Sequence, residues 1–70
     1  MKIAIIGLGL MGGSMAIDLK KRDWANYIIG VDSDKLHAET AQKIGFVDKL
    51  MSFEEAVDAS ELIILATPAN

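Results

Sequence analysis

The sequence of 70 residues has no cysteine, a single proline and few aromatic side chains. Without cysteine, the chain can form neither a disulfide framework nor a thiolate metal site. Its apolar runs are far shorter than the roughly 18 residues that a membrane-spanning helix needs, so we expect no membrane segment. Positive charge is also scarce. Seven Lys and Arg stand against ten Asp and Glu, and the net charge of −3 argues against nucleic acid or an anionic membrane as a partner.

The chain also lacks recognisable targeting and catalytic patterns. Met1-Lys2-Ile3 leads directly into an apolar run without a signal-peptide pattern, so we expect a cytoplasmic protein. No combination of residues suggests a metal site or a nucleophile–base pair, so we assign no catalytic residue and no metal ligand. His37 falls in a predicted helix, where a lone histidine is usually a solvated or half-packed residue. At this length the chain forms one small domain at most.

What the sequence does contain is an alternation of strand and helix patterns. Apolar runs predict strands at residues 2–6, 27–31 and 62–66, with a brief fourth one at Phe46-Val47. Between them, a first helix is expected at about 10–22. A second, capped by Ser33 or Asp34, runs to about Ile44 and stops at Gly45. The capping box Ser52-Phe53-Glu54-Glu55 opens a short third helix that runs to about Ala59. Right-handed βαβ crossovers then give an α/β fold with a parallel sheet in the order 3-2-1-4, in three α/β/α layers.

The run at 62–66 has the composition of a strand buried on both faces, yet the sequence ends soon after it. Either the chain is a fragment of a longer domain, or this strand leaves an exposed apolar edge that invites pairing.

The strongest functional signal is Gly7-Leu8-Gly9-Leu10-Met11-Gly12, directly behind the first predicted strand. In such a strand–turn–helix, the first glycine permits the tight turn. The second lets the backbone approach a pyrophosphate, and the third lets helix and strand pack closely. The helix N-terminus offers N–H groups and partial positive charge to the anion. The alternative interpretation is a tight turn without a ligand.

An acidic residue is expected about 20 positions after these glycines, at the end of the second strand, and Asp32 lies there. Its carboxylate would accept hydrogen bonds from the adenosine ribose and repel a 2′-phosphate. Because Ser33-Asp34-Lys35 contains no arginine, the pattern favours NAD over NADP. The alternative for Asp32 is a turn or helix-cap residue. We therefore predict a partial, Rossmann-type doubly wound domain. Its candidate cofactor-binding residues are Gly7, Leu8, Gly9, Leu10, Met11, Gly12, Asp32, Ser33, Thr67 and Pro68.

With its continuation Gly13-Ser14-Met15-Ala16, the glycine loop resembles that of prephenate and arogenate dehydrogenases. Further similar stretches are Gly30-Val31-Asp32, Gly45-Phe46-Val47-Asp48 and residues 62–68, so the resemblance covers essentially the whole chain. The sequence departs from the usual pattern at Ser60-Glu61, where Ala-Asp is more typical. Related β-hydroxyacid dehydrogenases share the first glycines but usually continue differently after the third.

The resemblance implies NAD(P)-dependent oxidative decarboxylation of prephenate to 4-hydroxyphenylpyruvate, in tyrosine biosynthesis. It also implies that residues 1–70 are the N-terminal part of a dinucleotide-binding domain, and that a C-terminal helical domain, which dimerises and carries the catalytic residues, lies beyond this chain. The chain alone is then expected to be inactive. Two other classes remain open: an NAD-sensing regulatory module of the potassium-transport kind, and a methyltransferase that binds S-adenosylmethionine.

Overall fold

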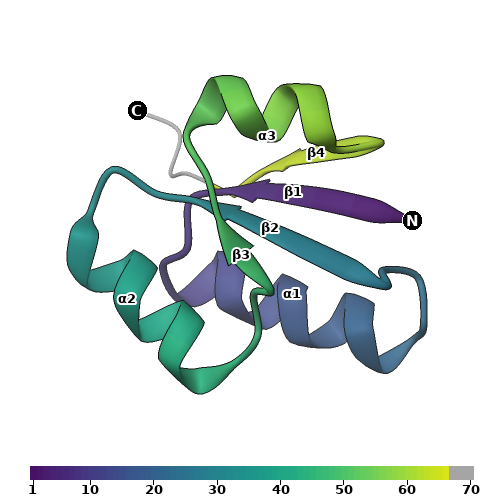
Figure 1. The fold of residues 1–70 in the computed structure, drawn as a ribbon. Coiled ribbons are helices and arrows are strands. Elements are labelled where there is room, and N and C mark those ends of the chain that lie inside the picture. The colour runs from purple at the N-terminus through teal and green to yellow at the C-terminus, as the bar shows by residue number, and fades with distance from the viewer. Residues whose placement is uncertain (67–70) are drawn as a thin grey trace.

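A computed structural model describes residues 1–66, except for the side chains of Leu10 and Met11. Strands and helices alternate along the chain: β1 (Lys2–Ile6), α1 (Leu10–Lys21), β2 (Tyr27–Val31), α2 (Lys35–Ile44), β3 (Lys49–Leu50), α3 (Phe53–Ala59) and β4 (Leu62–Leu65). All paired strands are parallel, and the sheet has the order β3-β2-β1-β4 (Figure 1). The predicted strand order is confirmed.

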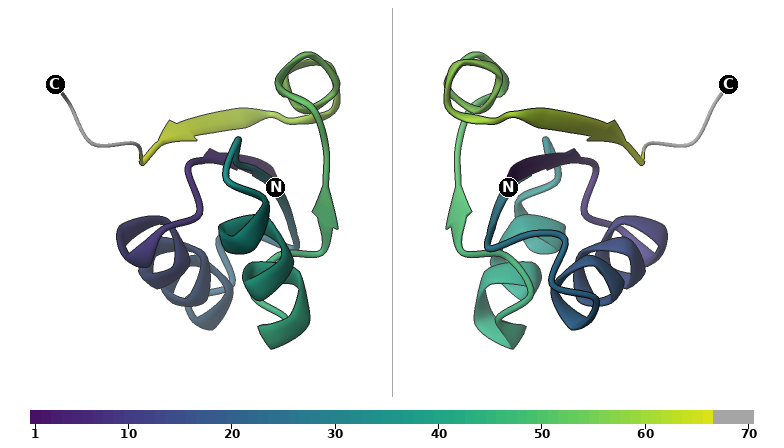
Figure 2. Two further views of the ribbon diagram at one scale, coloured as in Figure 1. Left: turned by 90° about the vertical axis from the view of Figure 1, so that its left-hand side faces the viewer. Right: turned by 90° about the vertical axis from the view of Figure 1, so that its right-hand side faces the viewer.

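The sheet carries helices on both faces, as the side views show (Figure 2): α1 and α2 cover one face and α3 covers the other. Alternate residues of the strands supply the two cores. Ile3, Ile5 and Ile28 pack toward α1 and α2, while Ala4 and Ile29 pack with Ala56 of α3. Since Ile3 pairs with Ile28 and Ala4 with Ile29, each strand pair presents matched side chains to the same helix layer. The predicted three-layer α/β/α arrangement is confirmed.

The ends of α2 and α3 follow from their sequences. Asp34 caps α2, because its carboxylate accepts hydrogen bonds from the N–H groups of Leu36 and His37. Gly45 ends this helix in the left-handed region with φ 97°, where a residue without Cβ is favoured. Ser52 and Glu55 form the reciprocal capping box expected for α3.

The third strand lies at Lys49–Leu50, so the prediction of a strand at Phe46-Val47 is wrong. Val47 is buried in the core between the sheet and the two helices, and Phe46 packs against Gly13 of α1. The apolar side chains of these two residues fill the space between the sheet and the helices, and pairing with β2 begins only at Lys49. The N–H of Asp48 donates to the carbonyl oxygen of Ile28 at 2.8 Å, ahead of the two paired residues of β3.

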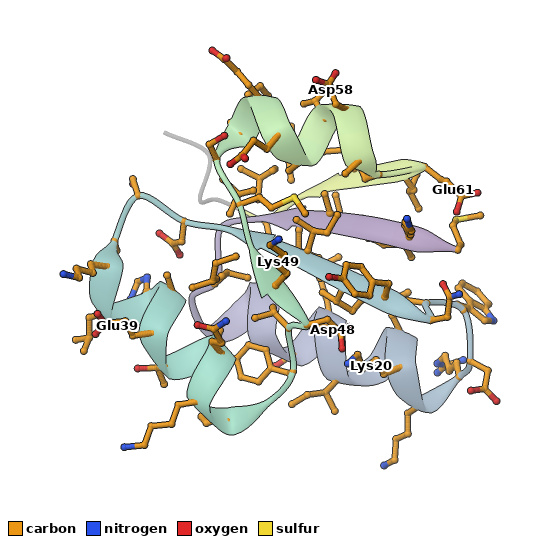
Figure 3. The ribbon with its side chains drawn as sticks, in the orientation of Figure 1. Lys20, Glu39, Asp48, Lys49, Asp58 and Glu61 are labelled. Atoms are coloured by element: carbon orange, nitrogen blue, oxygen red, sulfur yellow. The ribbon has the colours of Figure 1, made fainter. Side chains whose placement is uncertain are left out.

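Asp48 also fastens the start of β3 to its surroundings through its side chain. One carboxylate oxygen accepts the N–H of Ile28 at 2.7 Å, and the other lies 2.9 Å from the ammonium of Lys20 on α1. Figure 3 shows the Lys20 and Asp48 side chains pointing toward one another between α1 and the strand. Partial burial raises the pKa of Asp48, but the Ile28 N–H and Lys20 outweigh it, so the pKa lies below 3.8.

β4 is not buried on both faces, contrary to what its composition predicts. Leu62, Ile63 and Leu65 are exposed, Leu65 by 71%. Within residues 1–66, β4 pairs with β1 on one side, and no other strand pairs with its outer edge. The outer edge of β4 is therefore apolar and exposed in this part of the chain, which is compatible with both possibilities that the sequence leaves open. In the same part of the chain, no helix combines the length and apolarity needed to cross a membrane.

Candidate functional site

The glycine loop joins β1 to α1 at the carboxyl end of the central strands, and two of its glycines are required by the fold itself. Gly7 turns with φ 98°, and its N–H donates to the carbonyl oxygen of Val31 at 2.7 Å, which ties the loop to the end of β2. A Cβ built on Gly12 would lie 2.0 Å from the carbonyl oxygen of Gly7. Any side chain at Gly12 would therefore push α1 away from β1.

Gly9 has a different role, because its surroundings are open. Its φ of −67° is accessible to any residue, and a Cβ there would have only the ring carbon Cε1 of His37 within 4 Å, at 3.8 Å. The fold therefore does not require glycine at this position. A ligand that passes close to the backbone would require it.

The N-terminus of α1 is left open by its sequence. Gly9 occupies the cap position, no side chain caps the helix, and its first turn carries no acidic residue. The other two helices, by contrast, use Asp34 and Ser52 as side-chain caps. Unpaired N–H groups at a helix start favour a negatively charged group such as a phosphate. This end of α1 therefore has the chemistry of an anion site, next to the one loop glycine that the fold does not need.

Asp32 follows β2 directly and is bound to the glycine loop. Its Oδ2 accepts the N–H of Leu8 at 2.6 Å, and its Oδ1 accepts the N–H of Asp34 at 2.8 Å. The side chain is only 10% exposed. Partial burial raises the pKa of Asp32, but the N–H groups of Asp34 and Leu8, together with His37, outweigh it and hold the pKa below 3.8. The carboxylate is therefore ionised at neutral pH.

The carboxylate of Asp32 still has acceptor capacity. Two ionised carboxylate oxygens offer about four lone-pair positions. Backbone N–H groups use two of them, and Nδ1 of His37 lies near a third, 3.3 Å from Oδ2. A hydroxyl donor can thus bind Oδ1 directly, and a second can bind Oδ2 if His37 moves aside. Two adjacent hydroxyls, as on a ribose, match this arrangement.

His37 was not selected from the sequence as a site residue, yet it lies between the loop and the acidic residues. It belongs to the first turn of α2, five residues after Asp32 and three after Asp34, and its Nε2 is 3.7 Å from Oδ2 of Asp34. Helical spacing from the cap is the signal that could have placed it here. Its ring also lines a groove of about 390 Å³ between α1 and α2, together with Leu8, Gly9, Gly13, Ser14, Ile17, Leu36, Thr40, Ala41, Ile44 and Phe46.

The structure thus brings together the predicted residues that it describes. Leu8 contributes its backbone, because its side chain is buried in the core and its N–H is already bound to Asp32. Leu10 and Met11 begin α1, and Ser33 is exposed beside Asp32. The predicted rim residues Thr67 and Pro68 lie outside the described residues. Among residues 1–66, no group of three or more acidic, histidine or cysteine side chains could hold a metal ion.

Comparison with known proteins identifies the family of this chain. Residues 2–70 match the family model described as "NADP oxidoreductase coenzyme F420-dependent". The chain belongs to this family. Its match covers all the elements that form the site, from β1 to β4.

Individual relatives also support the resemblance that the glycine loop suggested. The chain is 40% identical to a prephenate dehydrogenase of Bacillus subtilis (strain 168) over 69 residues, which are 97% of this chain. It is 39% identical to a prephenate dehydrogenase of Lactococcus lactis subsp. cremoris (strain MG1363), over 99% of this chain. The chain spans about a fifth of these relatives, 19% of each. The predicted resemblance to prephenate dehydrogenases is confirmed.

Proposed function

We propose that this chain binds the adenosine–pyrophosphate half of a nicotinamide dinucleotide. The observation that carries the proposal is the hydrogen bond from the Leu8 N–H to Asp32, which holds this ionised carboxylate beside the uncapped start of α1. The pyrophosphate would lie over Gly9 at this helix N-terminus, and the ribose hydroxyls would donate to Asp32. The open space at Gly9 supports the fit, since a Cβ there would stand where the backbone and the phosphates need to meet.

Within this proposal, NAD is the preferred cofactor. Asp32 and Asp34 place two carboxylates at the end of β2, and a 2′-phosphate would be repelled by both. The nearest lysine, Lys35, is largely exposed and lies 4.0 Å from the carboxylate of Glu39, which partly neutralises it. The family description names NADP, but the charges of this chain favour a cofactor with a free 2′-hydroxyl.

We further propose that the chain is the N-terminal part of a prephenate dehydrogenase-like oxidoreductase, which acts on prephenate or arogenate. When bound, the nicotinamide supplies the hydride acceptor for an oxidation in which the substrate also loses carboxylate as CO2. Residues of this chain bind and orient the cofactor through the glycine loop and Asp32. We assign them no proton transfer and no substrate contact. The 70-residue chain alone is therefore expected to bind NAD without prephenate-dependent NAD reduction.

Gly9→Ala tests the dinucleotide site with folding kept separate from binding. The alanine Cβ has room in the free protein, so we expect the free energy of unfolding to fall by about 1 kcal/mol or less. Calorimetric titration with NAD should nevertheless show at least about tenfold weaker binding, because the methyl group occupies the phosphate approach. Parallel titrations with NADP and S-adenosylmethionine separate the alternative classes. Unchanged NAD affinity in folded Gly9→Ala, or tighter binding of S-adenosylmethionine than NAD, would refute the proposal.

A further inference from the structure

His37 contacts both carboxylates at the proposed ribose position. Its Nδ1 lies 3.3 Å from Oδ2 of Asp32, and its Nε2 lies 3.7 Å from Oδ2 of Asp34. The ring is 48% exposed, so it can turn toward a ligand without disturbing the core. It also lies across from Gly9, where the pyrophosphate is proposed to bind. One side chain therefore connects the acidic end of β2 with the phosphate loop.

The charges that face His37 come from these two carboxylates. The glycine loop has no ionisable side chain, and the neighbouring groove residues from α1, Gly13, Ser14 and Ile17, are uncharged. On the same helix as His37, the side chain of Lys35 is 88% exposed, and its ammonium lies 4.0 Å from the carboxylate of Glu39. Protonation of His37 would thus change the local charge from −2 to −1 without another group in the described residues compensating for it.

We infer that His37 makes the discrimination between NAD and NADP dependent on pH, an inference that rests on the proposed function. When His37 is neutral, the carboxylates of Asp32 and Asp34 repel a 2′-phosphate. When it is protonated, the same ring presents a cationic N–H donor beside the 2′ position and can pair with that phosphate. A 2′-hydroxyl needs only the Asp32 carboxylate, which stays ionised throughout the range in which imidazole titrates. Because the pyrophosphate near Gly9 also faces His37 and is common to both dinucleotides, the effect of the 2′-phosphate is read from the ratio of the NADP and NAD affinities.

The test compares NAD and NADP affinities by calorimetry at about pH 5.5 and about pH 8.5, on either side of the imidazole titration. In the wild-type chain, the affinity for NADP relative to NAD should rise at the lower pH. His37→Gln keeps a polar, helix-compatible side chain but cannot become charged. Because the 2′-phosphate itself titrates near pH 6 in both proteins, the difference between them isolates His37. We expect the wild-type rise to exceed that of His37→Gln by about fivefold.

Two further measurements test the same inference. His37→Lys should bind NADP more tightly than wild type at the higher pH, because its charge is permanent. His37 is also the single histidine of the chain, so the imidazole signals in an NMR titration report on it alone. Saturating NADP should move the imidazole titration midpoint to higher pH than saturating NAD does, because only NADP adds a 2′-phosphate beside the ring.

The outcomes separate the two proposals. If the wild-type chain binds NAD, but His37→Gln shows the same pH-dependent selectivity as wild type, the inference about His37 is refuted and the proposed function stands. If the folded wild-type chain binds neither dinucleotide, the proposed function is refuted, and the inference with it.

Discussion

Replacing Asp32 by Asn is the most informative single change, because this carboxylate is both a support of the glycine loop and the proposed ribose ligand. Its two oxygens accept N–H groups from Leu8 at 2.6 Å and from Asp34 at 2.8 Å. An asparagine has one acceptor oxygen and one donor amide. It can therefore satisfy one of these N–H groups and must turn its own N–H₂ toward the other.

The expected loss of stability in Asp32→Asn follows from these contacts. A hydrogen bond to a charged group contributes about 1.5–3 kcal/mol net, and the side chain of Asp32 is only 10% exposed, so little of this is lost to solvent screening. We expect Asp32→Asn to lower the free energy of unfolding by about 2–3 kcal/mol. Domains of this length have a total of about 4–10 kcal/mol, so the variant should still fold at low temperature.

The effect on binding should separate the two cofactors. Loss of the charged acceptor should weaken NAD binding by about tenfold, which is equivalent to about 1.4 kcal/mol of binding free energy. Removal of a negative charge beside the proposed position of the 2′-phosphate should strengthen NADP binding by about fivefold. Urea unfolding gives the stability change, and calorimetric titrations on the folded variant give both affinities.

Asp34→Asn is the matched control, because it removes the same charge two residues away. Asp34 is exposed, its carboxylate caps α2 through the Leu36 N–H at 2.9 Å, and Asn is an equally good cap. Its free energy of unfolding should change by less than about 0.5 kcal/mol, with NAD affinity kept. If the Asp32 and Asp34 variants behave alike in both stability and cofactor preference, the role assigned to Asp32 is wrong.

Two further predictions concern residues that support the fold around the site. Gly12→Ala should prevent α1 from packing closely on β1, because the added Cβ would lie 2.0 Å from the Gly7 carbonyl oxygen. Unfolding followed by circular dichroism should show that this variant is destabilised by more than about 3 kcal/mol, in contrast to Gly9→Ala. Asp48→Asn should lower the free energy of unfolding by about 1–2 kcal/mol, whereas Lys20→Met should cost less than about 1 kcal/mol, since the pair is a third exposed. Because the folded-state pKa of Asp48 lies below 3.8, its stabilisation is present above about pH 4 and is lost as the pH falls through that lower value. Urea midpoints measured from neutral to acid pH should therefore fall less steeply in Asp48→Asn, and parallel profiles would contradict the assignment.

Local sequence patterns predicted the parts of the molecule that short-range chemistry determines. The capping box at Ser52, the stop at Gly45 and the strand order all follow from signals within a few residues or from the handedness of βαβ units. The glycine loop and Asp32 were found in the same way, because their spacing reflects one turn and one crossover.

The errors arose where burial depends on distant residues. Phe46 and Val47 have strand-like composition, but Gly13 and the sheet leave space that these side chains fill. The run in β4 has the composition of a strand buried on both faces, but among residues 1–66 no other strand pairs with its outer edge. His37 is a half-exposed helical residue, as the sequence predicts, but its approach to Asp32 depends on how α2 leaves the sheet, which the local pattern does not reveal.

The hydrogen bonds of the loop bear on how a dinucleotide would bind. Gly7 donates its N–H to Val31 and Leu8 donates its N–H to Asp32, so the first two residues of the loop are fixed to the end of β2 and to the residue after it before any ligand arrives. The N–H groups at the start of α1 have no side-chain cap and remain for the ligand. A loop held in this way need not become ordered on binding, which removes an entropic cost from association. In the proposed complex, Asp32 would therefore contribute to affinity twice, through the ribose and through the shape of the phosphate loop.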